Sequence, residues 1–520
     1  MNKKHTKLLL GLLLVTSVSS FLGGCSSLTK GYSFKEADNS KGSVGYEIFV
    51  RAFEDGNGDG IGDLKGLTNR LDYLKDLGIK RIWLMPVMPS SSYHKYDVDD
   101  YFNIDKEYGT LDDFDEMVTS AHQKGIDVII DLVLNHTSSN NKRFLQSRAA
   151  YIKGSAKADW YCWSKTPQEG YNKDSSINAY YESRFSSNMP ELNLDNEDNF
   201  EWIKSIVDFW IKDHKIDGFR LDATTYYFYQ NILKNVEFIK KFSSYVRSVK
   251  SDAYIVGEAW ENSQNTINEY AKSGINFFNF PTSEMNNFGF ANSLTSRSYW
   301  KALGSTIVSM NGGIRASSTT SNPCCFITNH DQNRWDSYFA GPDQDATRKL
   351  CVSLYLLTPG TPWMYYGEEI AMNGPKDTNV TDAGIRQAMV WGKDEGRCKN
   401  SSGYKDTNQN TVGALDALKD DSSLINHYKK VINVRNLYNE VFEKGEWSLF
   451  DTSSANKMIG FKITLDSHDY YLLHNAYKYE DKIKVPVGVN VLEDVAVEEN
   501  KSSLESGLLS IKGFSSVLLG

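Results

Sequence analysis

The stretch DVIIDLVLNH, residues 127–136, sets six aliphatic side chains between polar ends. An aliphatic run that stops at a charge is typical of a buried barrel strand whose last residues enter a site at the carboxyl-terminal rim. Three more runs end in this way: GFRLDA at 218–223, YIVGEAW at 254–260 and FITNHD at 326–331. The charged ends of the four runs are Asp131, Asp222, Glu258 and Asp331. The sequence therefore predicts one acidic pocket, built from several strands and suited to acid and base chemistry.

Strand-like runs alternate with amphipathic segments along most of the chain. The amphipathic segments include 64–77, 111–124, 200–212 and 232–249. This repeating order of strand and helix predicts an α/β fold, a (β/α)8 TIM barrel with parallel strands. The eight expected strands are 46–50, 81–85, 128–133, 218–221, 254–256, 275–278, 325–328 and 363–366.

Two regions depart from this order. The interval 137–198 is polar and rich in tyrosine, and we expect it to form a domain inserted after the third strand. After a helix at 423–438 the pattern changes to short alternating strands, including 458–464 and 470–473. The barrel is thus predicted over 44–136 and 199–440, and a C-terminal antiparallel β-sandwich over 441–520.

The N-terminus has the pattern of an export signal. Lys3 and Lys4 precede an apolar segment at 8–15 and small residues before Cys25. Residues 22–25, LGGC, resemble the lipobox of bacterial lipoproteins, which implies a signal peptide over 1–24, acylation of Cys25 and a tether over 25–43. A membrane-spanning anchor is the alternative, but the apolar segment is shorter than the ~20 residues that a span needs. We expect an exported lipoprotein, anchored to the membrane at the cell surface.

The charge and the cysteines exclude several classes of function. The formal net charge is −9, and removal of residues 1–24 takes away three lysines and no acid, which leaves −12. This makes nucleic acid an unsuitable partner. The five cysteines other than Cys25 are an odd set without zinc-type pairing, so they predict neither a disulfide framework nor a metal cluster. We expect a monomer.

The four motifs, in this order and at the third, fourth, fifth and seventh strands, resemble those of the alpha-amylase family, glycoside hydrolase family 13. The resemblance runs from about Gly45 to the end of the chain. Cleavage of a glycoside needs one carboxylate to attack the anomeric carbon and a second acid to protonate the departing oxygen. The resemblance implies that Asp222 is the nucleophile, Glu258 the acid/base and Asp331 the third carboxylate. Arg220 lies two residues before Asp222 on a strand, so its guanidinium can hold the nucleophile ionised.

The same resemblance supplies residues that bind the substrate. His136 and His330 each follow an asparagine at a strand end, and they resemble the two histidines that hydrogen-bond the sugar before the cleaved bond. Tyr96 and Asp97 resemble the tyrosine that stacks on this sugar and the aspartate that contacts its hydroxyls. Lys95 stands where the family usually has glycine, so we expect a local difference in this loop.

Further substrate contacts are expected on both sides of the cleaved bond. Arg386 resembles the arginine that closes the subsite before that bond, and a purely structural role is its alternative. Thr225 and Tyr226 replace a Lys-His pair that many alpha-amylases place at the leaving-group side. Stacking by Tyr226 or Trp260 is expected to compensate for the lost polar contacts.

The stretch DGNGDGIGD, residues 55–63, spaces oxygen side chains as a hard cation requires. It matches the calcium loop after the first strand in many members of the family, which implies a Ca²⁺ site. It is not an EF-hand, because Gly66 occupies the twelfth position. An Asp/Gly turn without metal is the alternative. The expected ligands are Asp55, Asn57, Asp59, the backbone carbonyl of Ile61, and Asp63.

A second calcium site of the family, between the barrel and the inserted domain, would use Asn135 and the acid of the segment 189–193. This chain has Glu191 where the family usually has aspartate, and Tyr226 where many members have histidine. The sequence leaves that second site open.

The resemblance implies a retaining, endo-acting alpha-amylase that hydrolyses α-1,4 bonds of starch and maltooligosaccharides by double displacement. Ala223, next to the nucleophile, goes in this family with α-1,4 cleavage, whereas Glu191 resembles the branch intermediate between oligo-1,6-glucosidases and neopullulanases. An oligo-1,6-glucosidase, a neopullulanase-like enzyme or a transglycosylase is therefore the alternative within the family. A non-catalytic glucan-binding protein is the alternative outside enzymes. The intact Asp222, Glu258 and Asp331 argue against it.

Overall fold

The computed structural model describes residues 44–283, 289–296, 300–339, 343–376, 382–400, 404–452, 458–496 and 501–520. The predicted signal peptide, the acylated Cys25 and the tether up to residue 43 lie outside the described residues. Within the described part of the chain, no helix is both long enough and apolar enough to cross a membrane.

Eight parallel strands build the central sheet. They are β1 Gly45–Ile48, β2 Arg81–Leu84, β3 Asp127–Leu132, β7 Gly218–Leu221, β8 Tyr254–Gly257, β9 Asn276–Phe278, β10 Pro323–Cys324 and β11 Trp363–Tyr365. Their order is β10-β9-β8-β7-β3-β2-β1-β11. Backbone hydrogen bonds join the two edge strands, from Thr361 N to Pro323 O at 2.9 Å and from Trp363 N to Cys325 O at 2.8 Å. These bonds close the sheet, so the predicted (β/α)8 barrel is confirmed.

Large side chains fill the inside of the barrel. One buried cluster includes Trp83, Ile129, Val256, Phe278 and Trp363. Because these residues come from five different strands, the space that they share is the barrel interior. They form a packed floor beneath the carboxyl ends of the strands, where the site of a barrel enzyme lies.

The seventh strand lies two residues earlier than predicted. The expected strand was 325–328, whereas β10 covers Pro323–Cys324. Phe326 and Ile327 are still fully buried, but they lie beyond the paired residues. The apolar run at 325–328 therefore predicted the burial of these residues correctly but placed the paired strand too late in the sequence. Since the chain leaves the ladder early, the segment that ends at Asp331 is free to turn toward the rim.

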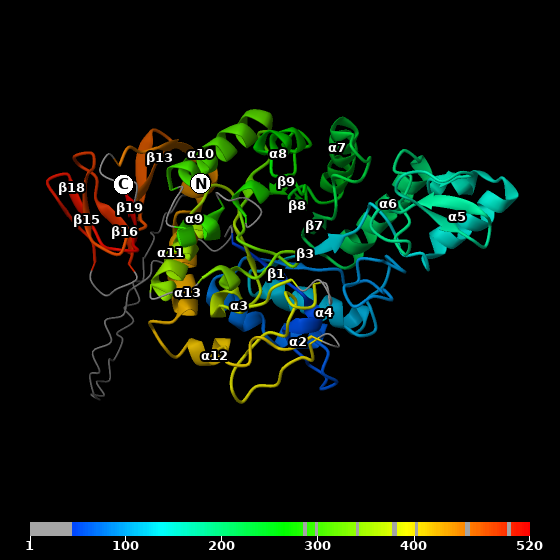
Figure 1. Cartoon of the computed structure of the whole chain (residues 1–520), viewed down its shortest axis with the longest axis horizontal. Coiled ribbons are helices and arrows are strands. Elements are labelled where there is room, and N and C mark those ends of the chain that lie inside the picture. Colours follow the sequence, from blue (N-terminus) through cyan, green and yellow to red (C-terminus); the bar gives the residue numbers. More distant parts are fainter. Residues whose placement is uncertain are drawn as a thin grey trace, which may run out of the picture. The chain divides into compact units, whose positions relative to one another are not determined.

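Helices surround the strands, and several begin at a side-chain cap. α4 Leu111–Gln123 and α7 Ile232–Val249 match the segments predicted at 111–124 and 232–249. α4 begins with a capping box formed by Thr110 and Asp113, and α7 begins at the Asn231 cap. Figure 1 shows α7, α8 and α10 on one side of the strands. Four helices, α2, α3, α5 and α6, are described below. Besides these and the two already bounded, the helices are α1 Val50–Phe53, α8 Gln264–Ala271, α9 Phe290–Ser296, α10 Trp300–Ser317, α11 Gln344–Leu356, α12 Ala414–Ala417, α13 Leu424–Leu437 and α14 Asn439–Lys444. Short 3-10 turns lie at η4 Phe280–Thr282, η5 Trp335–Tyr338 and η6 Glu368–Ile370.

Two predicted helices differ from the structure. The segment 64–77 forms two helices, α2 Leu64–Asn69 and α3 Leu71–Leu77, separated by Arg70. Arg70 pairs there with Glu54 at 3.0 Å and with Glu395 at 2.8 Å, which ties the break to two other segments. The segment predicted at 200–212 begins earlier, as α6 Glu197–Asp208, and ends in a π-helical turn, η3 Phe209–Asp213.

The segment after β3 forms a small lobe with its own sheet. Its strands β4 Trp163–Ser164, β5 Tyr171–Asp174 and β6 Ala179–Glu182 pair in the order β4-β6-β5. Helix α5 Lys142–Lys153 and the 3-10 turn η2 Ala156–Trp160 precede them. Phe144 of α5 stacks on Trp163 with ring centres 5.5 Å apart. A backbone hydrogen bond of 2.9 Å, donated by Leu192 N to Asn135 O, joins the end of the lobe to the segment after β3.

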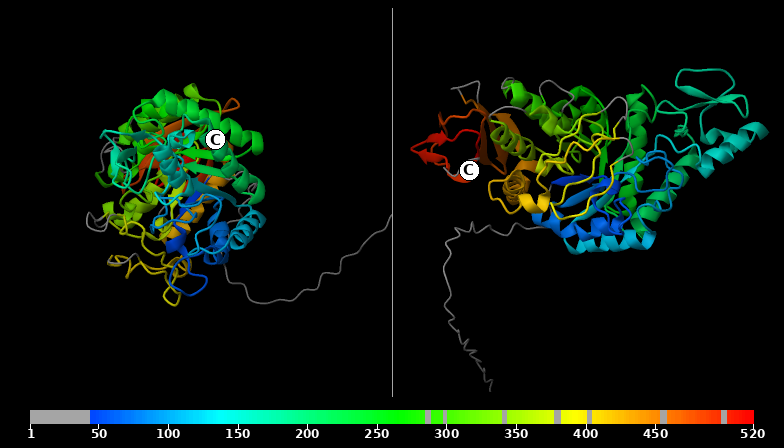
Figure 2. Two further views of the ribbon diagram at one scale, coloured as in Figure 1. Left: turned by 90° about the vertical axis from the view of Figure 1, so that its right-hand side faces the viewer. Right: turned by 60° about the horizontal axis from the view of Figure 1, so that its bottom comes forward.

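Two antiparallel sheets follow the barrel, orange to red in Figure 2. The larger has the order β12-β13-β14-β19-β16 and the smaller β15-β18-β17. Residues from both sheets, among them Tyr471, Leu473, Ile483 and Leu509, pack as one buried cluster, so the predicted β-sandwich is confirmed. The strands are β12 Glu446–Leu449, β13 Met458–Leu465, β14 His468–Asn475, β15 Asp481–Lys484, β16 Val491–Val495, β17 Ser503–Glu505, β18 Leu508–Ile511 and β19 Ser516–Leu519.

Candidate active site

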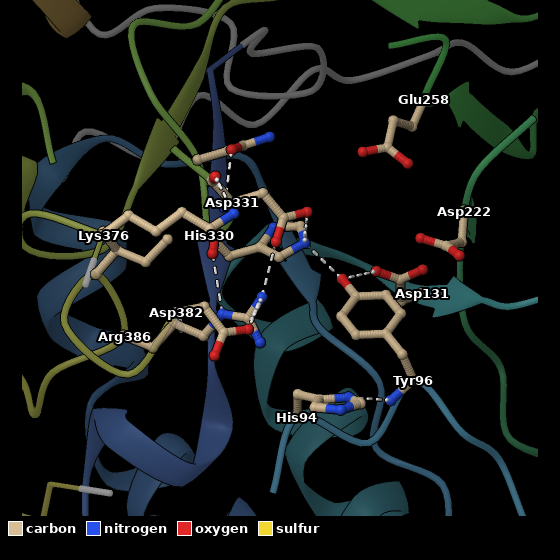
Figure 3. Close-up of polar contacts among 12 residues, drawn as sticks. His94, Tyr96, Asp131, Asp222, Glu258, His330, Asp331, Lys376, Asp382 and Arg386 are labelled. Atoms are coloured by element: carbon tan, nitrogen blue, oxygen red, sulfur yellow. Dashed lines mark hydrogen bonds and ion pairs between the residues drawn. The ribbon is translucent and has the colours of Figure 1, made fainter. Parts of the chain in front are cut away.

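A cavity of about 750 Å³ lies at the carboxyl ends of the barrel strands. Asp222 directly follows β7, Glu258 directly follows β8, and Asp331 lies beyond β10; all three line this cavity. Figure 3 shows the carboxylates of Asp222 and Glu258 facing the same space as that of Asp331. Three of the four predicted carboxylates are thus brought together.

The fourth carboxylate, Asp131, lies beneath the cavity and is fully buried. Arg220 holds it there, with Nη1 2.9 and 2.8 Å from its two oxygens. The expectation that Asp131 enters the pocket is therefore wrong. Asp131 is within β3, one residue before its end, and so sits deeper than the others. Burial raises the pKa of Asp131 to about 6, although Arg220 lowers it.

The guanidinium that pairs with Asp131 also binds the two predicted catalytic residues, Asp222 and Glu258. Its Nη1 lies 2.7 Å from Asp222 Oδ1, and its Nη2 lies 3.1 Å from Glu258 Oε2. Arg220 is itself buried, so these bonds are shielded from water. One cation therefore fixes the positions of both carboxylates from behind.

The carboxyl group of Glu258 has a second donor. Ala223 N donates to Glu258 Oε2 at 2.9 Å. Ala223 has a left-handed backbone, φ 48°, which is unusual for a residue with a Cβ and aims this N–H at the carboxylate. Burial raises the pKa of Glu258 to about 7; Arg220 lowers it, and Asp222 raises it further. Glu258 therefore holds a proton close to neutral pH, as a general acid must.

Asp331 lies between two cations. Its Oδ2 is 3.1 Å from His330 Nε2, and its Oδ1 is 2.8 Å from Arg386 Nη2. Burial alone would raise the pKa of Asp331, but His330 and Arg386 lower it well below its usual range. Burial opposes the charge on His330 as well, yet Asp331 and Glu47 raise its pKa to about 10. Asp331 is thus an anion at every physiological pH.

Arg386 has a further partner, Asp382, whose Oδ2 lies 2.8 Å from Arg386 Nη2. Tyr93 donates its hydroxyl proton to the same carboxylate. Asp382 lines the cavity, as does Lys376, and the sequence analysis singled out neither. Figure 3 shows Lys376, Asp382 and Arg386 on the side of Asp331 that faces away from Asp222.

The predicted sugar-binding residues divide into two groups. Tyr96, His136, Trp260 and Arg386 line the cavity. His136 Nε2 is a buried ring nitrogen with no close side-chain partner among the described residues. Asp97 and His330 are buried instead and do not line the cavity. The hydroxyls of Ser90, at 2.7 Å, and Ser92 donate to Asp97 Oδ1, and both ring nitrogens of His330 have protein partners. These bonds let Asp97 hold the loop that carries Tyr96. His94, which was not predicted from the sequence, lines the cavity.

An aromatic wall stands on the side where the lobe meets the barrel. It comprises Phe185, Tyr226 and Tyr229, which all line the cavity. The Phe185 and Tyr226 ring centres are 4.6 Å apart, and Tyr226 stacks on Tyr229 at 5.6 Å. The guanidinium carbon of Arg184 lies 3.9 Å from the Tyr229 ring centre. Phe185 is 46% exposed and Tyr229 40%, so their rings are available to a ligand.

The loop 55–63 lies away from this cavity. Asp55 accepts hydrogen bonds from the backbone of Gly58 at 2.7 Å and Gly60 at 2.6 Å, and Asp63 accepts one from Gly66 at 2.6 Å. Lys399 Nζ donates to the carbonyl oxygen of Asp59 at 2.7 Å. Across the described ranges, no group of three or more His, Cys, Asp or Glu side chains is placed to hold a metal ion.

Protein partners surround the position of the second calcium site. Glu191 Oε1 accepts from Arg184 N at 2.8 Å, and Asn135 also donates to this carboxylate. Burial raises the pKa of Glu191 to about 7; Glu182 raises it further, and the bonds from Arg184 and Asn135 lower it. A carboxyl that takes a proton near neutral pH is a weak ligand for a hard cation.

Comparison with known proteins extends the likeness beyond these motifs. The family described as "Alpha amylase, catalytic domain" matches residues 47–445. Alpha-amylase 3 of Dictyoglomus thermophilum is 38% identical, over 85% of this chain and 86% of that protein. The 4-alpha-glucanotransferase of Thermotoga neapolitana is 31% identical, over 64% of this chain and 72% of that protein. The solved structure of Eubacterium rectale Amy13B aligns with a TM-score of 0.87 at 35% identity, over 93% of this chain and 96% of that one.

Proposed function

Because this chain belongs to the alpha-amylase family of glycoside hydrolases, we propose that it cleaves internal α-1,4 bonds of starch and maltooligosaccharides with retention of configuration. One observation carries the proposal: the guanidinium of Arg220 bonds both Asp222 and Glu258 at the rim of the cavity. Two neighbouring carboxyl groups, one of them with a raised pKa, are what a double displacement requires.

The two steps use these carboxyl groups in turn. In the first step an oxygen of Asp222 attacks the anomeric carbon, and Glu258 gives its proton to the departing glycosidic oxygen. In the second step Glu258 takes a proton from water, the water oxygen bonds to the anomeric carbon, and the bond to Asp222 breaks. Each step inverts that carbon, so the product keeps the α configuration.

The anionic Asp331 has a different role in this scheme. Positive charge develops on the sugar ring as the glycosidic bond breaks. A carboxylate that is already ionised and held by His330 and Arg386 stabilises that charge without reorganising. Tyr96 and His136 line the same space and would bind the ring and its hydroxyls.

The choice of linkage rests on Ala223. Its N–H is one of the two donors to Glu258, so the backbone there sets the direction from which the leaving oxygen is protonated. A time course of products from starch, pullulan, maltotetraose and isomaltose tests the proposal. We expect kcat/KM for maltotetraose to exceed that for isomaltose by at least ~10-fold, or about 1.4 kcal/mol. Equal or better turnover of isomaltose would instead make the enzyme an oligo-1,6-glucosidase.

A second activity, glycosyl transfer, is favoured by the aromatic wall of Phe185, Tyr226 and Tyr229. Flat rings bind the apolar face of a sugar, so this wall would retain an acceptor sugar beside Glu258. The acceptor hydroxyl would then take the place of water in the second step. The time course distinguishes the two outcomes, because products longer than the substrate form only by transfer.

We further propose that Ca²⁺ binds to the loop 55–63. Its three aspartates and Asn57 supply oxygen atoms of the kind that Ca²⁺ prefers, and backbone amides hold Asp55 and Asp63 in place. The described structure does not already gather three of these carboxylates around one point, so binding would have to draw them together. A bound ion would offset the repulsion among these carboxylates. It would supply no chemistry, since none of the loop residues lines the catalytic cavity. Chelation should therefore lower the melting temperature, and elemental analysis should find the metal; an unchanged melting curve with no bound metal would refute the site.

For the N-terminal segment we propose export and lipid attachment at Cys25, which suits an enzyme whose polymeric substrate is too large to import. Cys25→Ser should move the protein from the membrane fraction to the soluble secreted fraction with unchanged specific activity. A variant that stays in the membrane fraction would favour a spanning anchor.

A further inference from the structure

Lys95 stands between two residues of the catalytic cavity but does not enter it. His94 and Tyr96 line the cavity, whereas Lys95 is 1% exposed and is not among the lining residues. Its Nζ lies 2.9 Å from Asp105 Oδ2 and 3.0 Å from Glu107 Oε2. The side chain therefore extends behind the loop that carries its two neighbours.

The backbone at Lys95 is left-handed, with φ 61°. This conformation favours glycine, because the Cβ of any other residue is crowded there. Such a residue persists where surrounding contacts determine its conformation, and here those contacts are the ion pairs of Lys95.

The ion cluster behind the loop is balanced in charge. Arg51, in helix α1, pairs with Glu107 at 3.0 Å, so two cations meet two carboxylates. Asp105 Oδ2 also accepts from the backbone N of Ser90 at 3.1 Å, at the start of the same loop. The cluster therefore joins both ends of the loop 90–95 to the segment 105–107. Because Lys95 and Asp105 are both buried, little water screens their attraction.

On its other face the loop carries Tyr96 into the catalytic network. The Tyr96 hydroxyl lies 3.0 Å from Asp131 Oδ2 and 2.7 Å from His330 Nε2, and its ring stacks on His330 at 5.6 Å. Its backbone N lies 3.1 Å from His94 Nδ1. Figure 3 shows the Tyr96 ring standing between Asp131 and His330, with His94 beside it. Asp131 is bonded to Arg220, and His330 is paired with Asp331, so both partners of the Tyr96 hydroxyl belong to the catalytic network.

We propose that Lys95 is a positioning residue for the glycosidase reaction. Its buried pair with Asp105 and its partly exposed pair with Glu107 hold the loop from behind, and this fixes the Tyr96 ring against Asp131 and His330, where the reacting sugar would bind. The inference rests on the proposed hydrolytic function, because it assigns to Lys95 an effect on that reaction.

Four variants of the full chain test the inference on maltotetraose. Lys95→Met keeps the aliphatic stem and removes the charge, and Lys95→Gly restores the residue that the left-handed backbone favours. Lys106→Met is the matched control, because Lys106 is an exposed neighbour of the same cluster. We expect both Lys95 variants to lower kcat by about 10-fold with a smaller change in KM, since misplaced contacts are felt most in the transition state. Lys106→Met should change neither constant by more than about two-fold.

The outcomes separate positioning from a merely structural role. If the Lys95 variants melt at lower temperature but keep the wild-type kcat and KM at 25 °C, Lys95 only stabilises the fold and the inference is wrong. Lys95→Arg restores the charge and should recover part of the lost kcat; no recovery would also count against the inference. A wild-type enzyme that does not cleave maltotetraose would refute the proposed function instead. The same variants would then be compared on the α-glucoside that it does cleave.

Discussion

The catalytic cavity has two sides that differ in almost every physical respect. Asp222 and Glu258 are buried, Asp331 is partly exposed, and each of the three carboxyl groups is held by at least one cation. On the leaving-group side the lining is aromatic and partly exposed, with Phe185 from the lobe and Tyr226, Tyr229 and Trp260 from the loops after two barrel strands. The charged side has one arrangement fixed by hydrogen bonds, whereas the aromatic side offers flat surfaces of low specificity.

This difference separates two tasks. Bond cleavage needs groups whose charge and position do not change with the substrate, and the ion network around Arg220 supplies them. Choice of acceptor and chain length depends on weaker contacts along an open surface. Changes on the charged side should therefore abolish the reaction, while changes on the aromatic side should alter its products.

The largest effect is expected from the catalytic carboxyl groups. Asp222→Asn and Glu258→Gln should each lower kcat by at least ~10³-fold, because each removes one half of a two-step displacement. Steady-state rates on maltotetraose, together with circular dichroism spectra that match the wild type, measure this. A variant of either residue that keeps a tenth of the activity would mean that another group performs its step.

The next effect is a pH dependence that belongs to the charged side alone. Glu258 must carry a proton in the first step, and burial raises its pKa to about 7. The value of kcat/KM should therefore fall about 10-fold per pH unit as the pH rises above that pKa. Phe185→Ala should leave this limb of the profile where it is. A profile that stays flat up to pH 9 would show that Glu258 is not the acid.

A smaller effect is expected from the aromatic side. Phe185→Ala and Tyr226→Ala should raise KM for maltotetraose by about 3- to 10-fold, which is the loss of a stacking contact worth about 1 kcal/mol. Both variants should also reduce the proportion of products longer than the substrate. Leu145→Ala is a suitable control, because Leu145 is exposed on the lobe and does not line the cavity. If longer products persist in unchanged proportion, the wall does not bind the acceptor.

The smallest effect is on stability and has an unexpected sign. The pKa of Glu258 is raised in the folded protein, so between the unfolded value of 4.5 and about 7 the folded state binds more protons. Stability from this group is therefore present below pH 4.5 and is lost as the pH rises through about 7. Glu258→Gln removes the dependence and should raise the melting temperature at pH 8 but not at pH 5. Melting curves at the two pH values measure it.

The charged side could be predicted largely from the sequence, because each of its carboxylates ends an apolar run and the order of the runs places them on one rim. Asp131 shows the limit of that reasoning. Its run looks like the other three, but Asp131 falls within β3 and is fully buried beneath the cavity. Depth depends on the stagger between neighbouring strands, which a single strand's pattern does not contain.

The aromatic side was much less predictable. The sequence predicts stacking by Tyr226 or Trp260, because Thr225 and Tyr226 replace a polar pair at the leaving-group side. Phe185 lies in the lobe, and its place beside Tyr226 results from the way the lobe folds back to Asn135, which no local periodicity encodes. Lys95 was noticed only as a departure from glycine. Its pairing with Asp105 and Glu107 is a tertiary contact that the loop sequence does not reveal.

The configuration of the newly formed product tests the central claim most directly. In the proposed reaction Asp222 and Glu258, joined by the guanidinium of Arg220, carry out two inversions at the same carbon. Proton NMR spectra of maltotetraose hydrolysis in its first minutes should show the α anomer of the new reducing end, with the β anomer growing in only as mutarotation proceeds. A β anomer formed first would mean a single displacement, which needs carboxyl groups ~6.5 to 9.5 Å apart with water between them, and would contradict the role of Asp222 as nucleophile.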